Sequence, residues 1–115
     1  MKKINKLKIE LYADGANLKY IKQLNKNKLV KGFTTNPSLM RKDGVRNYTK
    51  FAKSLLKIVK KPLSFEVFAD TEKEIIQQAI KISSWGKNVY VKIPIVFTNG
   101  KSTKKVINIL SNKYK

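Results

Sequence analysis

The chain has 115 residues, of which 26 are basic and 7 acidic, and its formal net charge is +19. It contains no Cys and no His, which excludes a disulfide scaffold, nearly all zinc chemistry and any nucleophile activated by His. The 42% hydrophobic content is enough for one packed core. No apolar run is long enough to cross a membrane or to form a signal peptide, so we expect a cytoplasmic protein without membrane contacts.

The positive charge has two explanations. Basic domains commonly bind nucleic acid, but 24 of the 26 basic residues are Lys, and specific base recognition depends on Arg. The lysines are spread from Lys2 to Lys115. The codons of Lys, Asn and Ile consist mostly of A and T, so a genome poor in G and C produces this composition without a selected partner. We therefore expect no nucleic-acid partner and keep polyanion binding as the alternative.

Four short apolar segments have the composition of β-strands. They are rich in β-branched and aromatic residues and are bounded by Gly, Pro, Asn or Asp. The segments are 8–14, 29–36, 63–69 and 88–95.

Each of these segments is followed by a stretch with helical spacing of apolar residues. The four stretches begin near Leu18, Tyr48, Ile75 and Val106. A helix start is expected at Asp70-Thr71, before Glu74. The β-α order, repeated four times, predicts an α/β fold with parallel strands in the order 1-2-3-4, right-handed crossovers and helices on one face. No linker interrupts the chain, so residues 1–115 are expected to form a single domain.

Alternation within the strands predicts that Asp14, Glu66 and Lys92 project to the same side, near the carboxyl ends of their strands. Active sites of βα barrels lie at that end. One interpretation is a structural ion pair between Glu66 and Lys92. The other is that the Lys92 amine attacks a carbonyl to form a Schiff base, while the two acids move protons.

Two sequence blocks carry a family resemblance, Thr-Thr-Asn-Pro-Ser at 34–38 and Val-Lys-Ile-Pro at 91–94, together with segments 11–17 and 64–70. In this order and spacing they resemble the transaldolase family, which includes the fructose-6-phosphate aldolase-like enzymes. The resemblance covers nearly the whole chain, from about Leu7 onwards. It implies a parallel (βα)4 half of a TIM (β/α)8 barrel that transfers a dihydroxyacetone unit between sugar phosphates, as in the pentose phosphate pathway.

The resemblance also implies a role for individual residues. Lys92 matches the lysine that forms the Schiff base, Asp14 the acid/base of the first strand, and Glu66 the acid that acts through a catalytic water. Asn36 matches a residue that holds the donor's hydroxyls, and Thr35 lies beside it as a second substrate contact. The family's chemistry needs no cofactor and no metal.

The chain departs from the family in length, because an eight-stranded barrel needs about 200 residues or more. We expect a transaldolase-like domain that is truncated after its fourth βα unit and impaired as an isolated chain. The partners would be a sugar phosphate and either a second copy or another chain that completes the barrel. The alternative is an inactive half-barrel fragment that acts as an oligomeric or polyanion-binding module. Val96 and Phe97 stand where polar residues are expected.

Overall fold

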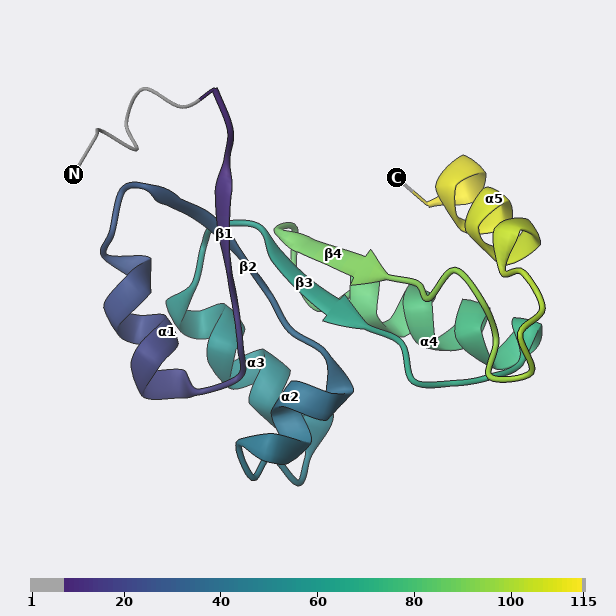
Figure 1. Ribbon diagram of the computed structural model, residues 1–115, viewed down its shortest axis with the longest axis horizontal. Coiled ribbons are helices and arrows are strands. Elements are labelled where there is room, and N and C mark those ends of the chain that lie inside the picture. Colours follow the sequence, from purple (N-terminus) through teal and green to yellow (C-terminus); the bar gives the residue numbers. More distant parts are fainter. Residues whose placement is uncertain (1–7, 115) are drawn as a thin grey trace. The chain divides into compact units, whose positions relative to one another are not determined.

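The computed structural model describes residues 8–114 and divides the chain into two compact units, Met1–Leu63 and Ser64–Lys115 (Figure 1). Four strands form a sheet in the order β1-β2-β3-β4, which is the order expected from the sequence. They are β1 (Leu11–Asp14), β2 (Val30–Thr34), β3 (Leu63–Glu66) and β4 (Val89–Lys92). Each is shorter than its predicted segment. Parallel strands that alternate with helices are the (βα)4 arrangement of half a TIM barrel. That the two units form one domain stays a prediction.

Over residues 8–63 the first unit contains three helices, α1 (Leu18–Asn25), α2 (Pro37–Lys42) and α3 (Tyr48–Ile58). An asparagine precedes each helix and caps it. The side-chain oxygens of Asn17, Asn36 and Asn47 accept hydrogen bonds from backbone N–H groups three residues further along. These caps satisfy N–H groups that a helix start would otherwise leave unpaired.

Helix α2 was not expected from the sequence, since no stretch with helical spacing was identified between the second predicted strand and Tyr48. The helix has only six residues, too few for a periodic apolar stripe, and Met40 is its one buried residue. Its signal was the cap itself, because Asn at the N-cap followed by Pro in the first turn is a common helix start.

The core of the first unit lies between strand β2 and helices α1 and α3. Phe33, Ile21 and Leu55 are almost completely buried, and each contributes about 1.5–3 kcal/mol by leaving water. β1 and β2 pair in parallel, with Tyr12 opposite Gly32. A Cβ atom at Gly32 would lie 2.5 Å from the Tyr12 ring, so the glycine is what lets these strands approach.

The second unit packs α4 (Glu72–Ser83) and α5 (Lys104–Lys113) with β3 and β4. Thr71 caps α4 as expected, because its hydroxyl accepts a hydrogen bond from the Glu74 N–H. The Phe65 ring meets the Trp85 ring edge to face, with centroids 5.7 Å apart. Within residues 8–114 no helix is both long and apolar enough to span a membrane.

Candidate active site

Three of the predicted site residues occupy the same position in their strands. Asp14 is the last residue of β1, Glu66 of β3 and Lys92 of β4. In a βα barrel the loops that leave these strand ends surround the active site. Strand geometry therefore places each of the three where the sequence predicted it, at the carboxyl end of a parallel strand.

Glu66 and Lys92 meet in the second unit. The Lys92 Nζ atom lies 3.7 Å from the Glu66 Oε2 atom, and the Val67 N–H donates to the Lys92 carbonyl at 3.1 Å. The Lys92 side chain is 39% exposed and the Glu66 side chain 25%. An ion pair this accessible contributes no more than about 1 kcal/mol to stability. The pair therefore contributes little to stability, and the Lys92 side chain is accessible to solvent.

Asp14 has its own partner in the first unit. The Thr34 hydroxyl donates to the Asp14 Oδ1 atom at 2.7 Å, because the parallel register puts these two residues opposite each other. Thr34 was not predicted as a site residue from the sequence. Its signal was its place at the end of the neighbouring strand, but only the register shows which of the two adjacent threonines faces Asp14.

The two predicted substrate contacts have different environments. The Asn36 Oδ1 atom is used to cap α2, where it accepts from the Leu39 N–H at 2.8 Å, so its Nδ2 group is the part suited to a ligand. Thr35 is completely buried. Its side chain does not reach solvent here, and its role as a substrate contact stays a prediction.

The segment after β4 forms a small hairpin over residues 95–103, which contains the unexpected Val96 and Phe97. Val96 pairs with Ser102 in an antiparallel bridge, and the Phe97 N–H donates to the Lys101 carbonyl at 2.8 Å. We call residues 95–103 the β4 hairpin. It closes on itself through backbone hydrogen bonds and so holds the apolar Val96 and Phe97 in a defined loop.

The β4 hairpin is anchored to the segment that follows β3. The Asp70 carboxylate accepts hydrogen bonds from the Thr98 hydroxyl and, at 2.8 Å, from the Thr98 N–H. These bonds, the hydroxyl first, lower the pKa of Asp70 below its ordinary value of 3.8. The Gln78 side chain accepts from the N–H groups of Phe68 and Ala69. Both segments that leave the Glu66–Lys92 pair are therefore fixed.

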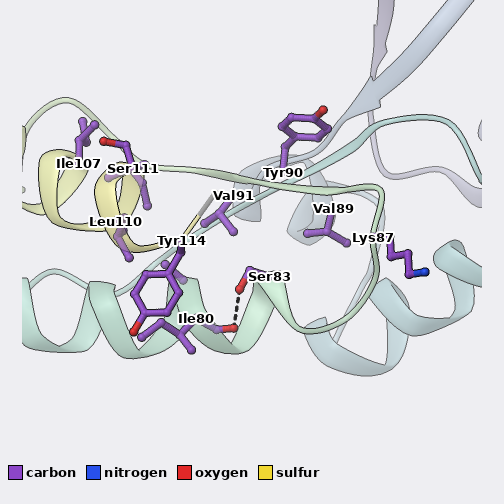
Figure 2. Close-up of a pocket in the computed structure, with 12 residues that line it drawn as sticks. Ile80, Ser83, Lys87, Val89, Tyr90, Val91, Ile107, Leu110, Ser111 and Tyr114 are labelled. Carbon is purple, nitrogen blue, oxygen red and sulfur yellow. Dashed lines mark hydrogen bonds between the residues drawn. The ribbon is translucent and has the colours of Figure 1, made fainter.

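A separate hollow of about 370 Å³ lies among α4, β4 and α5 (Figure 2). Figure 2 shows Val89 and Val91 pointing toward α4 and Tyr90 pointing to the opposite side, which is the alternation predicted for this strand. The Ile80 and Leu110 side chains line the hollow. It is thus an apolar space on the helix side of β4, apart from the catalytic candidates.

Comparison with known proteins gives consistent results. The family model Transaldolase/Fructose-6-phosphate aldolase matches residues 11–113. A probable transaldolase of Methanococcus vannielii is 38% identical over 105 residues, which cover 91% of this chain and 46% of the relative. One of Streptococcus equi subsp. zooepidemicus is 36% identical, with 91% and 47% covered, and one of Leptospira biflexa 35%, with 84% and 44%. The chain thus spans about half the length of these curated relatives.

Proposed function

The chain belongs to the transaldolase/fructose-6-phosphate aldolase family, and from this premise we propose that it contributes a Schiff-base site for cleaving or transferring the dihydroxyacetone unit of a sugar phosphate. The observation that carries the proposal is the approach of Lys92 to Glu66, 3.7 Å apart at the ends of β3 and β4. The proposal includes carbohydrate metabolism of the pentose phosphate type and a cytoplasmic location.

Lys92 supplies the nucleophile. Its unprotonated amine attacks the C2 carbonyl of a ketose phosphate, and the carbonyl oxygen takes up a proton to give a carbinolamine. Loss of water then leaves an iminium ion. Glu66, beside the amine, is suited to accept the amine's proton and to protonate the departing hydroxyl, directly or through a water molecule. The iminium is an electron sink within the protein, so the reaction needs no cofactor.

Asp14 supplies the base for the second step. It removes the proton from the C4 hydroxyl, the C3–C4 bond breaks, and the electron pair moves into the iminium to give an enamine while an aldehyde leaves. The Thr34 hydroxyl holds the carboxylate in one orientation. Asn36 contributes its Nδ2 group to a hydroxyl of the donor, since its oxygen is used in the cap of α2.

Borohydride trapping tests the proposal without requiring turnover. The protein is incubated with fructose 6-phosphate and sodium borohydride, and its intact mass is measured. We expect one covalent adduct per chain. Lys92→Arg should abolish the adduct because a guanidinium stays protonated and forms no imine. Glu66→Gln should slow its formation.

Lys101→Arg is the matched control, since Lys101 is an exposed lysine of the same unit outside the proposed site. This variant should trap as the unchanged protein does. An unaltered yield in Lys92→Arg, or no adduct in the unchanged protein, would contradict the assignment. Absence of an adduct in the unchanged protein would favour the alternative, a half barrel that serves as an oligomeric or binding module.

A further inference from the structure

The net charge is unevenly divided between the two units. Residues 1–63 contain 17 basic and 3 acidic residues, a net charge of +14, whereas residues 64–115 contain 9 basic and 4 acidic residues, a net charge of +5. Genome composition alone gives no reason for this difference, because both units come from one gene. The distribution of lysines in the first unit therefore needs a physical explanation of its own.

Lysines form stripes on two helices of the first unit. On α1 and on α3 they recur at spacings of three and four residues, which places them on one face of each helix. Others follow in the segment between α1 and β2 and at the start of β2. All are exposed. We call this set the lysine surface: Lys19, Lys22 and Lys26 on or directly after α1; Lys28 and Lys31; and Lys50, Lys53 and Lys57 on α3.

The two stripes meet at one end of the unit. The Asn25 side chain donates to the Ile58 carbonyl at 3.3 Å, which joins the ends of α1 and α3. The Lys61 Nζ atom donates to the carbonyls of Asn27 and Val30 at 2.9 and 2.7 Å. These bonds hold the loops together around a hollow of about 420 Å³. Its lining residues are Asn25, Lys26, Lys28, Val30, Lys31 and Lys61.

Within residues 8–114, none of the eight lysines of this surface forms an ion pair with a carboxylate. The acids of the first unit are Glu10, Asp14 and Asp43, and none of them lies on α1 or α3. Like charges at these helical spacings repel each other, which destabilises the free protein. A bound anion would reduce this repulsion.

Contrary to the expectation from composition, and in favour of the polyanion-binding alternative, we propose that the lysine surface binds the phosphate backbone of duplex nucleic acid without reading its sequence. The stripe from Lys50 to Lys57 covers about 10 Å along the helix, and a duplex presents one phosphate charge per about 1.7 Å of its axis. Lysine alone gives charge attraction without base recognition, and both arginines of the chain lie outside this surface.

A membrane fits this surface less well. Membrane-bound helices insert an apolar face into the lipid. On α1 and α3 that face is already used in the core, where Ile21, Ala52 and Leu55 are buried. The hollow at one end of the surface also lies apart from Asp14 and Thr34, since the loops around it precede β2 and β3 whereas those residues end β1 and β2. None of the eight lysines is a proposed site residue, so nucleic-acid binding is tested separately from the proposed catalysis.

The test measures the affinity of the full chain for a labelled DNA duplex of about 24 base pairs across a salt series. The triple variant Lys50→Gln, Lys53→Gln, Lys57→Gln should lower the slope of log affinity against log salt by about 2.5 to 3, since each phosphate contact contributes about 0.9. The control is Lys73→Gln, Lys81→Gln, Lys101→Gln in the second unit. It removes the same charge, from +19 to +16, and should leave the slope nearly unchanged.

Two duplexes of unrelated sequence should bind equally, and vesicles with anionic headgroups should bind more weakly than DNA at equal salt. Equal effects of the two triple variants would overturn the proposal, because they would show attraction by net charge alone. A salt-independent affinity, or binding to vesicles but not to DNA, would overturn it as well.

Discussion

At the scale of single residues, three asparagines have a structural role that the composition of the chain does not reveal. The abundance of Asn follows from codon usage in the sequence analysis, yet Asn17, Asn36 and Asn47 each cap a helix. An N-cap of this kind stabilises a helix by about 1 kcal/mol. Residues that are abundant because of codon usage can therefore still have specific structural roles. We propose such a role for the lysines of the first unit as well.

Gly32 gives a prediction at this scale. In Gly32→Ala the new Cβ atom would lie 2.5 Å from the Tyr12 ring and 2.7 Å from the Pro62 carbonyl oxygen. The ring is able to turn away, but the carbonyl belongs to the backbone. We expect the free energy of unfolding in urea to fall by about 1–3 kcal/mol. Ser38→Ala, at an exposed position of α2, should change it by less than about 0.5 kcal/mol. Equal stability of the two variants would contradict the close approach of these strands.

At the scale of elements, the spacing of apolar residues predicted more of the helices and strands than capping and turn residues did. The strands and the four longer helices follow from apolar spacing, because each buries one face. The side on which Val89, Val91 and Tyr90 lie followed from simple alternation. Helix α2 was missed because a six-residue helix has too few turns to show a stripe. The contact of Thr34 with Asp14 required the pairing register, which depends on neighbouring strands rather than on either segment.

The anchoring of the β4 hairpin gives a prediction about pH. The hydrogen bonds from Thr98 lower the pKa of Asp70, so its carboxylate favours the folded state above the ordinary value of 3.8. This contribution is lost as the pH falls through the lower pKa of the folded protein. We expect the Thr98 amide signal to titrate with a midpoint below 3.8 in an NMR pH series. In Asp70→Asn that titration should be absent. A midpoint at or above 3.8 would show that the anchor does not form in solution.

At the scale of the whole molecule, the (βα)4 arrangement and the family were predicted from the sequence, since repeated βα units favour neighbouring parallel strands and the motif spacing is read directly from the chain. The structure describes Asp14 with Thr34 in one unit and Glu66 with Lys92 in the other. That Lys92, beside Glu66, forms the Schiff base is the central proposal. The net charge is also a property of the whole chain. It points to a binding surface only because it is concentrated in the first unit.

The most direct measurement of that proposal locates the trapped adduct. The chain has 24 lysines, so chance reaction of a sugar phosphate with amines has many targets. After reduction with borohydride in the presence of fructose 6-phosphate, peptides are mapped by mass spectrometry. The account predicts that the adduct is on Lys92 alone, because Glu66 assists proton transfer only there. An adduct on a different lysine, or one spread evenly over the exposed lysines, would contradict it.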